Sequence, residues 1–184
     1  MKPAVFIDRD GTINVERHYL HKPEEFDFIP GVPEALKRLQ DAGFLLVVVT
    51  NQAGIGRGYY SEADMERLHD HMKRLLEPYG VRFTGIYHAP EAPHQPSERR
   101  KPAPGMLLEA QRNHGIDLGR SYMVGDKRID LEAGWNAGCK SSLLVRTGYG
   151  RETEQKEADL LNGAPVVDDL AEATGWILKN DGLA

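Results

Sequence analysis

The chain has 184 residues, with 28 acidic and 23 basic side chains and a formal net charge of −5. This length is typical of one domain with a buried core, and we expect residues 1–184 to form a single domain. The small negative charge, without a long run of either sign, argues against nucleic acid or an anionic membrane as partner. A lone cysteine, no membrane-length apolar run and no N-terminal signal region together predict a cytoplasmic protein.

Apolar runs alternate with amphipathic patterns along the chain. Continuous β-branched runs predict strands buried on both faces, and apolar stripes that begin at Pro or Ser predict helices. In chain order, the predicted elements are a strand at 4–7, a helix at 33–42, a strand at 44–49, a helix at 61–79, a strand at 83–88, a helix at 105–114, a strand at 122–124, a helix at 130–137, strands at 142–145 and 165–167, and a helix at 170–178. Strands separated by helices imply an α/β fold, a doubly wound, Rossmann-like and mostly parallel sheet with helices on both faces.

Three further segments have their own patterns. The helix at 61–79 has Ser61 as its predicted cap, with Asp64 three residues later. Its apolar stripe is interpreted as core rather than as a ligand site, and consists of Met65, Leu68, Met72, Leu75 and Leu76. A proline-rich loop is predicted at about 88–104, and the polar segment at 151–157 is predicted to be mobile, with no assigned role.

The first strand leads directly into the pentad Asp8-Arg9-Asp10-Gly11-Thr12. Asp8 and Asp10 would share a face if the extended path continued, and two carboxylates this close repel each other unless a cation or proton lies between them. A metal-assisted site is the economical explanation, with one Asp as a phosphoryl acceptor and the other handling a proton. Asp and Gly are also ordinary turn residues, so the motif alone leaves a plain turn open.

Polar groups also follow the other central strands. Thr50, Asn51 and Gln52 follow the second strand, and Asp126, with Asp130 four residues later, follows the strand at 122–124. The basic run at 99–101 precedes a helix, and in parallel sheets all these groups meet at one edge. There the Asp residues could hold Mg²⁺, Thr50 could bind a phosphate oxygen, and Lys101 could neutralise charge. Each piece alone is more typical of a turn or of solvated surface, and only their shared placement after the strands favours a site.

The motifs DRDGT, VVVTN, RKPAPGM and MVGDK together resemble the haloacid dehalogenase (HAD) superfamily of aspartate-nucleophile phosphatases. The resemblance implies that Asp8 is the nucleophile and Asp10 the general acid and base. It further implies that Thr50 and Lys101 bind the transferring phosphoryl group. The implied Mg²⁺ ligands are Asp8, Asp10 through its backbone carbonyl, and Asp126. Asp130 is implied to orient these ligands without itself binding the metal.

From about Val5 to Gly148, the motifs more narrowly resemble the D-glycero-D-manno-heptose-1,7-bisphosphate 7-phosphatase family. This implies an enzyme that removes the C7 phosphate of a small sugar bisphosphate, in the pathway to nucleotide-activated heptose for bacterial cell-surface polysaccharide. The segments after the first strand are too short for a full cap domain, which fits a capless member, and we expect a monomer. The related histidinol-phosphatase of histidine biosynthesis and a broader small-molecule phosphatase remain alternatives, and either sugar anomer remains open. The implied substrate contacts are Glu16, Arg17, His18, Tyr19, Asn51, Gln52, Ala53, Arg100 and Lys127; of these, Arg100 and Lys127 suit a twice-phosphorylated anion.

The proline-rich loop departs from that family, which commonly holds a structural zinc there with three Cys and one His. Here the corresponding positions hold Ala89, Glu91, Ser97 and Arg99. Two of these supply no usual donor for a tetrahedral site, so we expect no zinc. Glu91 and Arg99 are hypothesised to pair instead. A weaker candidate set of metal ligands in this loop is His88, His94 and Glu98. The alternative is that the loop is simply solvated.

Three other classes of protein fit the sequence less well than a phosphatase. A signalling receiver domain would end its middle strand with the phosphorylated Asp, whereas Thr50 follows the strand at 44–49. An inert sugar-phosphate binder would not need the full set of Asp8, Asp10, Lys101 and Asp126. A phosphotransferase or phosphomutase usually needs a cap that excludes water, for which this chain is too short.

Overall fold

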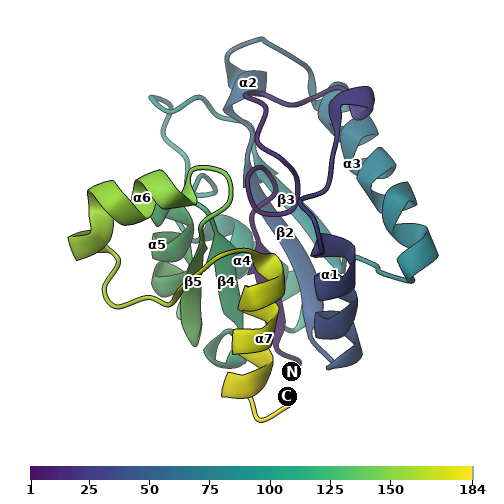
Figure 1. Ribbon diagram of the computed structural model, residues 1–184. Helices are drawn as coiled ribbons and strands as arrows, with labels where there is room; N and C mark the ends of the chain where they lie inside the picture. The colour runs from purple at the N-terminus through teal and green to yellow at the C-terminus, as the bar shows by residue number, and fades with distance from the viewer. Residues whose placement is uncertain (184) are drawn as a thin grey trace.

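The computed structural model describes residues 1–183, and over that range the strands form one six-stranded sheet (Figure 1). The strands are β1 (Ala4–Ile7), β2 (Leu45–Asn51), β3 (Gly85–Ala89), β4 (Tyr122–Gly125), β5 (Ser141–Val145) and β6 (Val166–Val167). Their order is β3-β2-β1-β4-β5-β6, and every neighbouring pair is parallel. The predicted doubly wound, Rossmann-like sheet is confirmed.

Helices cover both faces of this sheet. They are α1 (Val32–Asp41), α2 (Ala53–Gly56), α3 (Glu62–Leu76), α4 (Gly105–His114), α5 (Arg128–Ala137), α6 (Gly150–Glu157) and α7 (Leu170–Asn180). The apolar sides of α1, α3 and α7 form one core layer with the sheet, and α4 and α5 form the other. Figure 1 shows α1 and α7 side by side, with both chain termini at the end of the molecule opposite to α2. No helix within residues 1–183 combines the length and apolar character needed to cross a membrane.

The central strands are buried on both faces, as their sequences predict. In β1, Val5 and Ile7 enter the layer of α1, α3 and α7, whereas Ala4 and Phe6 enter the layer of α4 and α5. This alternation is the two-residue period of an extended chain. Ile7, the last residue of β1, is in register with Val48 of β2 and Val124 of β4, so the loop after β1 begins beside the carboxyl-terminal parts of both neighbouring strands.

Helix α3 confirms its predicted cap and corrects part of its predicted stripe. The Ser61 hydroxyl accepts a hydrogen bond from the Asp64 amide at 3.2 Å, and the Asp64 carboxylate accepts from the Ser61 amide. The α-helix ends at Leu76 and continues only as a 3-10 turn. Leu75 is 39% exposed, contrary to prediction, and the buried polar residue on this face is His69. The cause is the 100° helical step, which places Leu75 at the margin of the stripe.

The segment at 151–157 is not the mobile loop that its polar sequence predicted, because it lies within helix α6. Its supports are ion pairs to distant residues: Arg146 Nε to Glu154 at 2.7 Å and Arg128 Nε to Glu157 at 2.5 Å. The hydroxyl of Thr153 donates to the Asp126 carbonyl at 3.0 Å. These partners lie outside the segment, so its own composition carries no sign of them.

Candidate active site

A cavity of about 240 Å³ opens at the carboxyl edge of the sheet, where the loops after β1, β2 and β4 meet. Parallel sheets bind ligands at this edge because all their strands end there. The sheet register supports the convergence: the Asp8 amide donates to the Val124 carbonyl at 2.9 Å, which fixes Asp8 beside the end of β4. The residues that line the cavity are Asp8, Asp10, Glu16, His18, Tyr19, Thr50, Asn51, Gln52, Ala53, Tyr60, Arg100, Lys101, Lys127, Ile129, Asp130 and Tyr149.

Lys101 lies at the floor of the cavity, where it is 3% exposed. Its Nζ contacts Asp8 Oδ1 at 2.8 Å and Asp130 Oδ1 at 2.6 Å, and donates to the Val49 carbonyl at 2.8 Å. Burial opposes the ammonium charge, but Asp130 and Asp8 outweigh burial and raise the pKa of Lys101. A permanent cation therefore lies against the Asp8 carboxylate, in the place that the sequence predicted.

Three buried carboxylates form a cluster beside this lysine. Asp8, Asp126 and Asp130 each offer an oxygen, and these oxygens lie within 4.8 Å of one another. Burial raises the pKa of Asp8 to about 6, with Asp130 and Asp10 adding to the rise and Lys101 opposing it. Burial and the neighbouring Asp8 and Asp130 raise the pKa of Asp126 well above its usual range. This crowding of negative charge is relieved by a cation among the oxygens.

Asp126 supplies the observation that tests whether a metal fits. Its Oδ2 accepts a hydrogen bond from the Tyr149 amide at 2.8 Å, whereas its Oδ1 is buried without a hydrogen-bond partner. A buried carboxylate oxygen without a partner is costly in a protein interior. Hard oxygen ligands of this kind are those that Mg²⁺ prefers, so the cluster fits a divalent cation. His88, His94 and Glu98 form no comparable grouping within residues 1–183.

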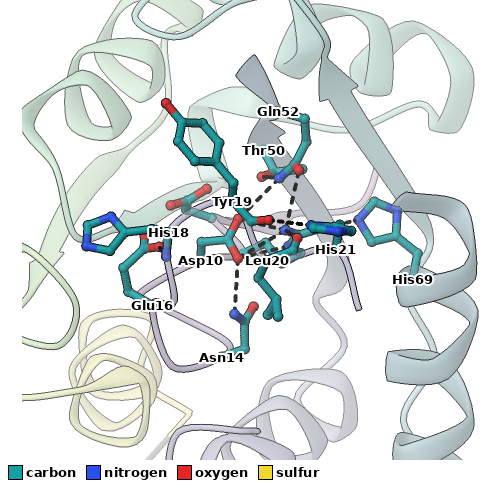
Figure 2. A network of polar contacts seen from close by, with 12 residues as sticks. Asp10, Asn14, Glu16, His18, Tyr19, Leu20, His21, Thr50, Gln52 and His69 are labelled. Atoms are coloured by element: carbon teal, nitrogen blue, oxygen red, sulfur yellow. Dashed lines mark hydrogen bonds and ion pairs between the residues drawn. The ribbon is translucent and has the colours of Figure 1, made fainter. Parts of the chain in front are cut away.

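The carboxylate of Asp10 is not part of this cluster. It pairs with Arg9, whose Nη2 lies 2.8 Å from Oδ2, and accepts from Asn14 Nδ2 at 3.1 Å and Gln52 Nε2 at 3.2 Å (Figure 2). Burial opposes its ionisation, but the charge of Arg9 and the hydrogen bonds from Asn14, Arg9 and Gln52 prevail and lower the pKa of Asp10. Only its backbone carbonyl therefore stays a candidate metal ligand, as the resemblance implied.

Residues at the end of β2 form the wall between Asp10 and Lys101. Thr50 is buried, and its hydroxyl accepts from Gln52 Nε2 at 2.8 Å; the Gln52 carbonyl oxygen in turn accepts from the Tyr60 hydroxyl at 2.5 Å. Asn51 uses both ends of its amide on the backbone of Lys101, donating to the carbonyl at 3.1 Å and accepting from the amide at 3.0 Å. Asn51 thus holds the loop that carries Lys101 against β2.

The predicted substrate-binding loop after β1 is only partly brought to the cavity. Glu16, His18 and Tyr19 line it, whereas Arg17 points elsewhere and pairs with Asp27 at 2.5 Å. Of the remaining predicted contacts, Gln52 and Ala53 line the cavity from the segment after β2, Arg100 from the proline-rich loop and Lys127 from the loop after β4. These last two add positive charge to the lining of a cavity that also holds the acidic cluster.

Sequence reasoning missed four residues of the site. Tyr60, Ile129 and Tyr149 line the cavity, and Arg9 is fully buried behind it. Tyr149 directly follows Gly148, where the family resemblance in the sequence ends, and Lys127 Nζ lies 4.4 Å from the centre of its ring. Its position next to that stretch was the only available signal, because aromatic residues in loops carry no pattern of their own.

The hypothesised pair of Glu91 and Arg99 is wrong. Arg99 Nη1 instead contacts Glu109 Oε2 of α4 at 3.2 Å, and the Glu91 carbonyl accepts from Arg100 Nη1 at 3.1 Å. The loop turns Arg99 toward α4 because both its amide and that of Arg100 donate to the Ser97 hydroxyl, each at 3.1 Å.

Comparison with known proteins agrees with this geometry. Residues 98–173 match the family model described as HAD-hyrolase-like. A D-glycero-beta-D-manno-heptose-1,7-bisphosphate 7-phosphatase of Haemophilus ducreyi is 49% identical over 168 residues, which cover 87% of this chain and 92% of that protein. The chain belongs to the heptose-bisphosphate phosphatase family of HAD-like hydrolases. A second member, from Escherichia coli K12, is 41% identical over 97% of this chain and 89% of its own length.

Comparison with solved structures shows that the similarity to heptose-bisphosphate phosphatases extends over the whole fold. The crystal structure of the D,D-heptose 1,7-bisphosphate phosphatase from B. bronchiseptica superposes with a TM-score of 0.90 at 35% identity, covering 97% of this chain and 99% of that one. That protein was crystallised with magnesium and phosphate. The same two ligands are those that the acidic cluster and Lys101 of this chain suit by their chemistry.

Proposed function

We propose that this protein is a Mg²⁺-dependent phosphatase that removes the C7 phosphate of D-glycero-β-D-manno-heptose 1,7-bisphosphate. The observation that carries the proposal is the buried contact of Lys101 Nζ with Asp8 Oδ1 at 2.8 Å, beside the carboxylates of Asp126 and Asp130. A carboxylate nucleophile paired with a cation suits phosphoryl transfer, where positioning and charge compensation supply most of the catalysis. The β anomer follows the names of the Haemophilus and Escherichia relatives.

In the first proposed step, a carboxylate oxygen of Asp8 attacks phosphorus in line. Lys101 and the hydroxyl of Thr50 hold the phosphoryl oxygens, and Lys101 offsets the charge that develops on them. The carboxylates of Asp8 and Asp126 with the backbone carbonyl of Asp10 would hold Mg²⁺, which would supply further positive charge against the phosphoryl group. The step leaves Asp8 as an aspartyl phosphate.

Asp10 is the proposed proton carrier in both steps. It protonates the departing sugar oxygen, and the resulting carboxylate then takes a proton from the water that hydrolyses the aspartyl phosphate. The lowered pKa of Asp10 keeps this carboxylate ionised in the free protein, which suits its role as base. The negative charge of an arriving phosphate favours its protonated form and so prepares the role as acid.

Two cationic side chains in the cavity support a substrate with a second anionic group. Arg100 and Lys127 line the cavity, and burial of Lys127 is outweighed by Asp126, Asp8 and Asp130, which raise its pKa and keep it charged. These two cations attract a second phosphate and repel the ammonium group of histidinol phosphate. Arg100 can in addition bind a phosphate with two parallel hydrogen bonds.

Phosphate release from a panel of esters tests the proposal. The panel contains heptose 1,7-bisphosphate in both anomers, histidinol phosphate, fructose 1,6-bisphosphate and p-nitrophenyl phosphate, each with Mg²⁺. We expect the highest kcat/KM for the β-heptose bisphosphate, with heptose 1-phosphate as the product. Preference for histidinol phosphate, or equal rates across the panel, would be compatible with an aspartyl-phosphate mechanism but would rule out heptose bisphosphate as the preferred substrate.

We further propose that the loop at 88–104 folds without zinc. In support, Ala89 and Arg99 offer no usual zinc donor, the Ser97 hydroxyl already accepts two backbone amides, and Arg99 is paired with Glu109. Protein purified from zinc-supplemented medium should contain zinc far below one ion per chain by elemental analysis. Its melting temperature should not change on treatment with a zinc chelator, whereas a structural zinc would make the fold chelator-sensitive.

A further inference from the structure

Helix α3 carries a histidine on the face that it packs against the sheet. His69 is 6% exposed and lies among the buried apolar residues Met65, Leu68 and Met72. Its Nε2 lies 3.0 Å from Nη1 of Arg9 (Figure 2). None of the proposed chemical steps uses this imidazole, and 60 residues of sequence separate it from its partner.

Arg9 is a wholly buried guanidinium whose N–H groups are distributed among four neighbours. Nε and Nη2 donate to the carboxylate of Asp10 at 2.8–3.2 Å, in a fork that fixes its plane. Nη2 also donates to the backbone carbonyl of Leu20 at 3.1 Å and to the side-chain Oε1 of Gln52 at 3.4 Å. The remaining nitrogen, Nη1, has His69 as its partner among the described side chains. The imidazole of His69 therefore binds the one guanidinium nitrogen that does not hold Asp10.

The direction of the hydrogen bond between Arg9 and His69 follows from their chemistry. A guanidinium has donors only and stays protonated in proteins, so the Nε2 atom of His69 must accept. The imidazole is consequently neutral, with its proton on Nδ1. Burial first, and then the charge of Arg9, lower the pKa of His69 to about 3, which agrees with a neutral acceptor.

Loss of this acceptor would leave a buried N–H of Arg9 without a partner. A buried donor without a partner is costly, so the guanidinium would turn to find another acceptor. Because the fork is planar and rigid, a turn at Nη1 also moves Nε and Nη2, and with them the carboxylate of Asp10. Asn14 and Gln52 would continue to hold Asp10, so the displacement would be partial.

We propose that His69 is a positioning residue for proton transfer, which acts by fixing the Arg9 guanidinium that aligns the Asp10 carboxylate with the leaving oxygen of the substrate. The inference rests on the proposed function, since it takes Asp10 as the acid in phosphoryl transfer. It assigns His69 no contact with substrate or metal.

Leaving-group dependence distinguishes such a role from general support of the fold. A sugar alkoxide cannot depart without a proton from Asp10, whereas p-nitrophenolate departs unprotonated. The ratio kcat/KM depends only on the steps up to and including the transfer of phosphorus to Asp8. It is therefore unaffected by the later hydrolysis of the aspartyl phosphate. A misplaced acid therefore lowers kcat/KM for heptose bisphosphate and spares p-nitrophenyl phosphate, whereas partial unfolding lowers both equally.

The test compares His69→Leu, which removes the acceptor, with His69→Gln, whose amide oxygen can replace Nε2. We expect His69→Leu to lower kcat/KM for heptose bisphosphate about tenfold, through kcat rather than KM, with p-nitrophenyl phosphate changed less than about twofold. His69→Gln should recover most of the loss. The control is His71→Leu on the same helix, whose ring packs against Phe26 and which should leave both substrates unchanged.

An equal loss on both substrates, or no loss in His69→Leu, would overturn the inference. If wild type hydrolyses another alkyl phosphate instead, the proposed substrate fails and the comparison is made with that ester. If His69→Leu does not fold, Arg9→Lys takes its place, because it keeps the charge and loses the fork. That variant should show the same selective loss, and an equal loss on both esters would likewise contradict the assignment.

Discussion

Asp8 and Asp10 stand two residues apart, yet their surroundings drive their ionisation in opposite directions. Burial raises the pKa of Asp8 to about 6, whereas Arg9 and two amide donors overcome burial and lower the pKa of Asp10. Neighbouring carboxylates with divergent pKa values are typical of sites in which the two groups have different tasks. Here Asp8 faces Lys101 and the acidic cluster, and Asp10 faces Arg9, so each has one task available to it.

At the residue scale, Asp8→Asn should abolish turnover without unfolding the protein. The amide cannot accept phosphorus, so phosphate release should fall by at least about a thousandfold. Lys101 keeps its contact with Asp130, and a buried carboxylate with a raised pKa is removed. The melting temperature should therefore equal or exceed that of wild type in a thermal scan. If the variant kept substantial activity, Asp8 would not be the nucleophile.

His69 makes the stability of the protein depend on pH. Its pKa is about 3 when folded against 6.5 when unfolded, so the unfolded chain binds the extra proton between these values. Its contribution to stability is complete above pH 6.5 and is lost as pH falls below that value. From pH 7 to pH 5, wild type should lose roughly 2 kcal/mol more unfolding free energy than His69→Gln in urea titrations. Parallel pH profiles of the two proteins would contradict a neutral, buried imidazole.

At the element scale, two loops close over Asp126 because each offers a glycine at the point of approach. A Cβ on Gly11 or on Gly148 would lie 2.2 Å from Asp126 Oδ2, and both residues have positive φ. The loop after β1 thereby reaches the end of β4, and the loop after β5 reaches both. The glycine of the DRDGT motif thus serves close packing at the acidic cluster as well as the turn.

Gly11→Ala should accordingly lower the unfolding free energy by more than the strain of its positive φ alone would. The matched control is Gly138→Ala, which has the same φ of 82° and nothing within 4 Å of the added Cβ. We expect the control to lose about 1 kcal/mol of unfolding free energy and to keep its activity. Gly11→Ala should lose more, and should need more Mg²⁺ for half-maximal activity. Equal behaviour of the two variants in urea and Mg²⁺ titrations would show that the contact with Asp126 is unimportant.

The elements also differ in how far their own sequence determines them. The helix at 105–114 is found with the predicted bounds, and the ends of most others move by one or two residues. Helix α6 has no apolar stripe, and depends on Arg128, Arg146 and the carbonyl of Asp126 for its contacts. Amphipathic helices can be predicted because their stripe is local, whereas a helix held by distant charges cannot.

At the scale of the whole molecule, the site depends on ties between segments far apart in the chain. Asn51 of β2 makes two hydrogen bonds with the backbone of Lys101, 50 residues away. Gln40 of α1 makes the same kind of clamp elsewhere, donating to the Gly80 carbonyl at 2.9 Å and accepting from the Arg82 amide at 2.8 Å. The two amides offer a matched comparison of support at the site and away from it.

Asn51→Ala and Gln40→Ala should each lower the unfolding free energy by about 1–2 kcal/mol, since each frees two backbone groups. Only Asn51→Ala should lower kcat, by about tenfold or more, because Lys101 would lose its alignment with Asp8. Steady-state kinetics and urea unfolding on both variants provide the measurement. If Gln40→Ala lowered kcat as much as Asn51→Ala, global loosening rather than the position of Lys101 would explain the effect.

The sequence by itself determined the alternation of strands and helices, the edge at which the ligands meet, and the roles expected of Asp8, Lys101 and Asp126. These features can be read from local patterns, because a buried strand, a helix stripe and a motif at a strand end each lie within a short window. The tertiary structure alone decided that Arg9 is buried against His69, that Tyr60 and Tyr149 line the cavity, and that Arg99 pairs with Glu109 rather than Glu91. Such contacts join separate elements, and their partners are chosen by packing, which no short window of sequence contains.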